Sequence, residues 1–158
     1  MIRVSAVVLM DAGRRILHVR KRGTSVFMLP GGKAEPGESD AEAAVREIAE
    51  EVGVTLNPDG LASWGEVVAP AANETGSTLV AAVFASPRPV AGARPAAEIE
   101  ELLWAHPGVD PGVPLAPLTL ALLPRLREFV ASAPTQAVAD SPGSSMKSPP
   151  DSWSAPRP

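Results

Sequence analysis

The chain has 158 residues, 45% of them hydrophobic, and a formal net charge of −4. This length and apolar content suit one domain with its own core, whereas general binding to nucleic acid polymers needs a basic surface that an acidic chain lacks. Cysteine is absent and there are only two histidines, which excludes disulfides and thiolate metal sites and argues against a histidine-based zinc site.

The N-terminal stretch is apolar but short. Residues 1–10 read "MIRVSAVVLM", which is too short for a membrane span and lacks a small-residue cleavage site. We therefore expect a cytoplasmic protein without membrane association, with its first strand at 4–10. The turn signal "DAGR" at 11–14 precedes an alternating segment at 16–21. This order predicts a second strand that pairs with the first as a hairpin.

A helix is predicted after a flexible loop. A short apolar segment at 27–29 leads into a Gly/Pro-rich loop at 31–38, and helical periodicity follows from about 39 to 52. Ser39 with Glu42 three residues later has the spacing of a capping box. These signals fix the start of the helix.

The predicted helix has two chemically different faces. One set of apolar residues recurs at helical spacing and is predicted to be buried, namely Ala41, Val45, Ile48 and Val52. The opposite side would carry Glu47, Glu50 and Glu51, which are neighbours by the i,i+3 and i,i+4 rule. Gly53 suits the position just after the helix end.

The second half of the chain predicts more strands and one more helix. Strands are expected at 61–69, 78–85 and 102–105, and a helix that packs on the sheet is expected at 114–132. Pro124 should kink this helix or split it in two, because proline lacks the backbone N–H.

The composition changes near residue 132. Residues 133–158 are rich in Pro, Ser and Ala and contain little that could be buried. We therefore predict one folded domain at 1–132 and a disordered C-terminal tail at 133–158.

The acidic side of the first helix indicates a cation site. Glu47, Glu50 and Glu51 repel one another, and Arg46 offsets only part of that repulsion. A hard divalent cation such as Mg²⁺ prefers oxygen ligands and would neutralise the patch. The backbone at Gly32 can approach a ligand closely, so that its carbonyl could join the metal shell. An ordinary solvated helix face is the alternative that charge alone leaves open.

The spacing of these residues resembles a known motif. Gly32, then five residues, Glu38, then seven residues, and then "REIAEEVGV" at 46–54 match the Nudix box of MutT-like hydrolases at all nine fixed positions. The resemblance implies an α/β fold, the Nudix α/β/α sandwich with a mixed β-sheet between helices, over 1–132. The tail has no counterpart in it.

The resemblance also implies an activity. Nudix hydrolases are pyrophosphohydrolases that use Mg²⁺ or Mn²⁺. They act on a nucleoside diphosphate that is linked to another moiety, X, and cleave its diphosphate linkage to give a nucleoside monophosphate and the phosphorylated moiety. Sanitation of the nucleotide pool, such as removal of 8-oxo-dGTP, is one such role. The expected partner is a small nucleoside diphosphate-type substrate rather than a nucleic acid polymer or a membrane, and the expected state is a monomer or a homodimer. An ADP-ribose or nucleotide-sugar pyrophosphatase, or a non-catalytic nucleotide-binding module, are the alternatives.

Site residues follow from the same resemblance. The implied metal ligands are Gly32, through its carbonyl, and Glu47, Glu50 and Glu51. Arg46 would orient the glutamates, and Glu38 would brace the loop against the helix or help at the metal. The implied catalytic set is Arg46, Glu50, Glu51 and Glu98.

The general base and the phosphate-binding residues are less constrained by the motif. Glu98, Glu100 and Glu101 precede a predicted strand, and we favour Glu98 as the base, with solvated loop charges as the alternative. Strand alternation places Arg20 and Arg22 on one face. They could clamp substrate phosphates or form an exposed basic edge.

Overall fold

The fold is built around its first strand, β1 (Ile2–Val8). In this computed structural model, β1 pairs antiparallel with β3 (Gly31–Gly32) on one side and parallel with β5 (Thr78–Ala85) on the other. Strand β4 (Ala62–Pro70) continues the sheet antiparallel to β5. The result is a mixed four-stranded sheet in the order β3-β1-β5-β4.

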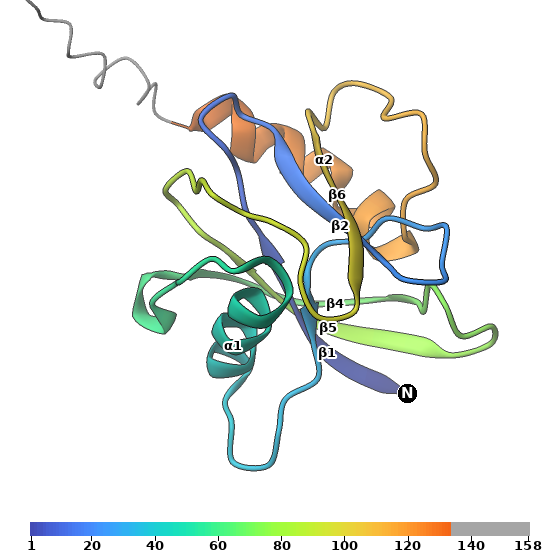
Figure 1. The fold of residues 1–158 in the computed structure, drawn as a ribbon. Helices are drawn as coiled ribbons and strands as arrows, with labels where there is room; N and C mark the ends of the chain where they lie inside the picture. Colours follow the sequence, from blue (N-terminus) through green and yellow to red (C-terminus); the bar gives the residue numbers. More distant parts are fainter. Residues whose placement is uncertain (134–158) are drawn as a thin grey trace, which may run out of the picture.

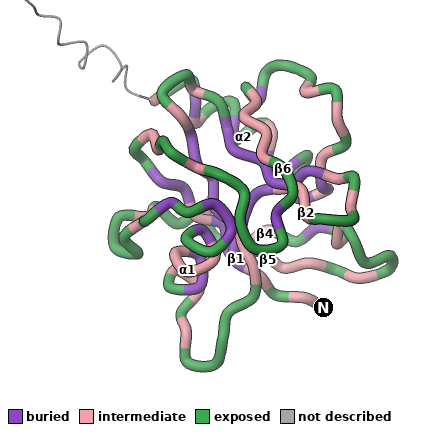
Figure 2. The backbone as a smooth tube through the Cα atoms, in the orientation of Figure 1, coloured by how far each residue is buried: buried purple, intermediate pink, exposed green. Residues whose placement is uncertain are grey.

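Both faces of β1 are buried, because successive side chains of a strand point to opposite faces. Ala6 and Val8 belong to a core cluster that contains residues of α2 (Pro117–Ser132). Val7 belongs to a second cluster that contains residues of α1 (Asp40–Val52). The two helices therefore lie on opposite sides of the sheet (Figure 1), which confirms the predicted α/β/α sandwich with a mixed sheet. Figure 2 shows the buried chain running between them.

The predicted hairpin between the first two strands is wrong beyond its turn. Strand β2 (Ile16–Lys21) pairs antiparallel with β6 (Ile99–Ala105) in a separate two-stranded sheet. Only an isolated bridge between Met10 and Ile16 joins the region after β1 to β2. The physical reason is that β3 and β5 already occupy both edges of β1.

Helix α1 begins and ends where the sequence predicts. Ser39 is its N-cap, and the Ser39 hydroxyl accepts a hydrogen bond from the Glu42 N–H at 3.0 Å. The Glu42 carboxylate in turn accepts the Ser39 N–H at 2.9 Å. Gly53 ends the helix with φ 70°, a conformation that glycine adopts without a Cβ penalty.

The buried face of α1 is rotated relative to the prediction. Ala41 and Val45 are only half-buried. The buried residues of the helix are Ala43, Ala44, Ile48, Glu51 and Val52. The face is therefore turned toward Glu51, so that one of the predicted surface carboxylates lies inside the protein.

The later elements agree more closely with their predictions. Strand β5 has the predicted bounds, β4 is shifted by one residue, and β6 begins three residues earlier than predicted. A short 3₁₀-helix at Pro58–Gly60 precedes β4.

Helix α2 is one continuous element and is not split at Pro124. Pro124 cannot donate the bond that would reach the carbonyl of Leu120. Leu120 is 52% exposed, so that water can reach the helix surface at this point. The helix starts at Pro117 instead of residue 114, because Pro114 and Leu115 are engaged with Phe27, whose N–H donates to the Pro114 carbonyl at 2.9 Å.

The structure describes residues 1–133. The predicted disordered tail therefore lies, apart from Ala133, outside the described residues. Within residues 1–133, neither helix is long and apolar enough to cross a membrane.

The packing of α2 after Pro124 can be tested by shortening single leucine side chains to alanine. Leu126 is fully buried in the core, and Leu126→Ala should lower the free energy of unfolding by about 2–5 kcal/mol. Leu120→Ala on the exposed side of the same helix should change it by no more than about 0.5 kcal/mol. Urea unfolding of both variants measures the difference. Equal losses would show that α2 does not pack as described.

Candidate active site

Arg46 ties the glycine-rich loop to α1. Its Nε and Nη2 donate to the two carboxylate oxygens of Glu38 at 2.6 and 2.9 Å, and Nη2 also donates to the Lys33 carbonyl at 3.0 Å. Glu38 further accepts the Glu35 N–H at 2.8 Å. The guanidinium of Arg46 lowers the pKa of Glu38 to about 2. This geometry is that of a brace between loop and helix.

Arg46 also reaches two of the acidic residues on α1. Its Nη1 donates to Glu47 at 3.1 Å and to Glu50 at 3.4 Å. One guanidinium therefore holds the loop and orients the neighbouring carboxylates, because its several N–H donors form a rigid fork.

Glu51 is buried at the junction of α1 and β3. Its side chain is 1% exposed, and its Oε1 accepts the Gly31 N–H at 3.2 Å. Gly31 has φ 153°, and a Cβ there would lie 1.9 Å from the Ser5 carbonyl oxygen of β1. Glycine at this position thus allows β3 to lie close to β1 and to present its N–H to Glu51.

Three carboxylates meet beside this junction. Oxygen atoms of Glu47, Glu51 and Glu98 lie within 4.8 Å of one another. Glu47 and Glu51 are one turn apart on α1, and Glu98 immediately precedes β6. Burial, helped by the negative charges of Glu47 and Glu98, raises the pKa of Glu51 to about 8, although the hydrogen bond from the Gly31 N–H opposes this rise. Burial is also the main cause that raises the pKa of Glu47.

This group of carboxylates fits a hard divalent cation. The ligand atoms that its side chains offer are all carboxylate oxygens, the type of ligand that Mg²⁺ and Mn²⁺ prefer. The backbone of Gly32 lies against Glu47, since a Cβ at Gly32 would be 2.5 Å from the Glu47 carboxyl carbon. Glycine therefore lets the main chain join the same site.

Glu50, the remaining predicted metal ligand on α1, lies outside the three-carboxylate group. Its side chain is 54% exposed and is hydrogen-bonded to Arg46. The reason is the rotation of α1, which turns Glu51 inward and leaves Glu50 on the side of Arg46.

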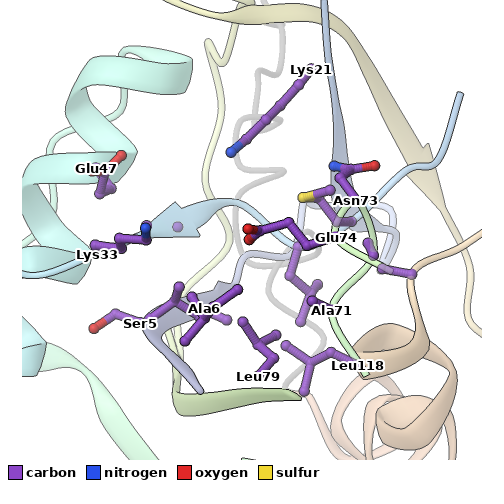
Figure 3. A pocket seen from close by; sticks show the side chains of 18 of the residues that line it. Ser5, Ala6, Lys21, Lys33, Glu47, Ala71, Asn73, Glu74, Leu79 and Leu118 are labelled. Carbon is purple, nitrogen blue, oxygen red and sulfur yellow. The ribbon is translucent and has the colours of Figure 1, made fainter. Parts of the chain in front are cut away.

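A cavity of about 470 Å³ opens beside the carboxylates. Glu47 and Glu98 line one part of it, together with Lys21 and Lys33. Figure 3 shows the side chains of Lys21 and Lys33 extending into this space. Apolar residues line another part, namely Val4, Ala6, Leu79 and Leu118. The site therefore combines acidic, basic and apolar surfaces in one pocket.

The structure does not bring Arg20 and Arg22 into this pocket. Arg20 is paired with Glu101 at 3.1 Å, and Arg22 donates to the Ala97 carbonyl at 3.1 Å. Instead, Lys21 lines the pocket. An irregularity in the register between Arg20 and Lys21 breaks the alternation from which the arginines were predicted.

The burial of Glu51 predicts how stability changes with pH. The pKa of Glu51 is about 8 in the folded protein but about 4.3 in an unfolded chain. The folded state therefore binds the proton more tightly, and its stability falls as pH rises from about 5 to 8. Glu51→Gln should flatten this slope in thermal melts with EDTA, whereas Glu128→Gln, an exposed carboxylate on α2, should keep it. Parallel slopes for all three proteins would contradict the burial of Glu51.

Comparison with known proteins identifies the family. The NUDIX domain model matches residues 1–108. The CTP pyrophosphohydrolase of Escherichia coli (strain K12) is 30% identical over 137 residues, which cover 85% of this chain and 97% of that protein. A Bacillus subtilis (strain 168) protein named "Putative 8-oxo-dGTP diphosphatase" is 47% identical over 47 residues. Those residues are 30% of this chain and 32%, about a third, of that relative.

A solved structure agrees with these matches. The MutT NUDIX hydrolase from Burkholderia pseudomallei superposes with a TM-score of 0.65 at 26% identity, covering 77% of this chain and 95% of that chain. The family match and the pyrophosphohydrolase relative support a hydrolase that acts on diphosphate bonds. The chain belongs to the Nudix family.

Proposed function

We propose that the protein is a Mg²⁺-dependent hydrolase that cleaves the diphosphate linkage of a nucleoside diphosphate derivative and releases a nucleoside monophosphate. The observation that carries this proposal is the group Glu47, Glu51 and Glu98 at a cavity that also receives two lysines. Cleavage of a diphosphate requires neutralised phosphates and an oriented water, and this arrangement supplies groups for both.

Four residues would hold the metal in this proposal. Glu47 and Glu51 offer carboxylates and Gly32 offers its backbone carbonyl. Glu50 would join them after leaving Arg46, and this costs little because an exposed ion pair contributes no more than about 1 kcal/mol. Bound Mg²⁺ or Mn²⁺ supplies charge neutralisation of the phosphate oxygens and activation of water.

The remaining residues act on the water and the phosphates. Glu98 is exposed and lies within 4.8 Å of Glu47 and Glu51, so we assign it as the base that accepts a proton from the attacking water. Lys21 and Lys33, which line the pocket, would neutralise phosphate charge. Arg46 acts through the glutamates that it orients.

The relatives support a nucleoside triphosphate as substrate. The two relatives above carry the names "Putative 8-oxo-dGTP diphosphatase" and "CTP pyrophosphohydrolase". The cavity of about 470 Å³ is in the usual range of small-molecule sites. We therefore propose sanitation of the nucleotide pool, with an oxidised nucleotide such as 8-oxo-dGTP as the substrate.

Hydrolysis assays test the proposal. The wild type, incubated with Mg²⁺ and a panel of nucleoside triphosphates, 8-oxo-dGTP, ADP-ribose, NADH and diadenosine polyphosphates, should hydrolyse 8-oxo-dGTP best. Glu51→Gln should lose about 10³-fold or more of kcat, because charge stabilisation is usually the largest catalytic contribution. Glu128→Gln, with the same change of charge outside the pocket, should retain full activity.

The other outcomes separate the alternatives. If the wild type hydrolyses ADP-ribose best, the protein is an ADP-ribose pyrophosphatase and does not act in sanitation of the nucleotide pool. Nucleotide binding without hydrolysis, equal in wild type and Glu51→Gln, would indicate a non-catalytic module and overturn the proposal.

Lys21 provides a second test, because it and not its arginine neighbours lines the pocket. Lys21→Met keeps most of the side-chain length but removes the charge, and should lower kcat/KM by about 10- to 100-fold through lost phosphate stabilisation. Arg22→Met, at an exposed residue paired with Glu100 at 3.4 Å, should change kcat/KM less than about 3-fold. The reverse order of effects would restore the sequence-based assignment of the arginines.

A further inference from the structure

The turn between β4 and β5 places a carboxylate, that of Glu74, in the cavity. Glu74 lines the pocket, and Figure 3 shows its carboxylate pointing into the open space. The turn itself is held by backbone bonds, since the Ala71 N–H donates to the Ser77 carbonyl at 2.9 Å and the Ser77 N–H donates to the Glu74 carbonyl at 3.1 Å. Glu74 therefore projects from a hydrogen-bonded turn.

The Glu74 carboxylate has no protein partner. Among residues 1–133, no ion pair or side-chain hydrogen bond engages it, whereas Glu47, on the same pocket, is held by Arg46 at 3.1 Å. Both Glu74 oxygens are thus available as acceptors, and an ionised carboxylate offers acceptors only.

Glu74 is also separate from the candidate metal site. Among residues 1–133, the group of three carboxylates that could hold a metal ion is Glu47, Glu51 and Glu98, and Glu74 is not a member of it. An ionised carboxylate repels phosphate oxygens and accepts hydrogen bonds, so Glu74 suits a part of the substrate that offers hydrogen-bond donors.

The surroundings of Glu74 suit a flat apolar ring. Ala71, Leu79 and Leu118 line the same pocket as Glu74, and Figure 3 labels all four side chains around it. A nucleobase can pack its face on such side chains while its polar edge needs hydrogen-bonding groups. Recognition of a nucleotide base combines these two kinds of contact.

We propose that Glu74 is the residue that selects the base, by accepting two hydrogen bonds from the edge of a guanine ring. Guanine presents two adjacent donors, the ring N1–H and the 2-amino group, which match the two oxygens of one carboxylate. Hypoxanthine keeps N1–H but lacks the amino group. Uracil presents a single N–H between two carbonyls, which the carboxylate would repel. Oxidation at C8 leaves the recognised edge unchanged, so that this inference rests on the proposed function and specifies its substrate as a guanine nucleotide.

Matched substrates isolate this contact. GTP and ITP differ only in the 2-amino group, and the wild type should favour GTP by about 10-fold in kcat/KM, in the range of one good hydrogen bond of base recognition. Glu74→Gln replaces one acceptor by a donor at the same size. It should lower kcat/KM for GTP by about 10- to 100-fold, mainly through KM, and bring the GTP/ITP ratio close to 1. The Mg²⁺ dependence and the melting temperature should stay unchanged, and Glu128→Gln should behave as wild type.

The same assays distinguish failure of this inference from failure of the proposed function. If the wild type hydrolyses nucleotides but Glu74→Gln leaves the GTP/ITP ratio at its wild-type value, Glu74 does not read the base and the hydrolase proposal stands. If the wild type prefers UTP over GTP, Glu74 likewise does not select guanine, and the hydrolase proposal stands. If the wild type hydrolyses none of GTP, ITP, UTP, 8-oxo-dGTP and ADP-ribose with Mg²⁺ present, both proposals are overturned together.

Discussion

The placement of the Glu51 carboxylate inside the protein is the constraint on which the site depends. A buried carboxylate beside two others is unfavourable, because burial and like charge both disfavour ionisation, and the pKa of Glu51 rises to about 8 accordingly. One Gly31 N–H offsets part of this cost. The divalent cation that we propose for this site would offset the rest.

The fold provides the geometry that this constraint requires. Strand β1 is buried on both faces, and α1 is held against one of them. Gly31 lets β3 approach β1 closely enough for its N–H to reach Glu51. The separate pairing of β2 with β6 brings Lys21 and Glu98, which are distant in sequence, to the pocket. The Arg46–Glu38 pair then fixes the loop between these parts.

Local signals predicted the elements well, whereas long-range contacts decided what the sequence could not show. Ser39, Glu42 and Gly53 determine the ends of α1 through contacts within a few residues. The partner of β2 and the inward turn of Glu51 depend on strands far away in the chain. Lys21 was missed because a register irregularity is invisible to strict alternation. Glu74 carried no signal in the sequence, since a charged residue in a turn is ordinarily solvated.

The central claim, that the carboxylate group around Glu51 is a divalent cation site, is tested most directly by calorimetric titration of Mn²⁺ into the metal-free protein at pH 7. Because metal ligands must lose their protons, the account predicts that the wild type binds Mn²⁺ and releases protons, detected by comparing buffers of different ionisation enthalpy. Glu51→Gln should bind at least about 10-fold more weakly and release fewer protons. Equal affinity and equal proton release in the two proteins would contradict the claim.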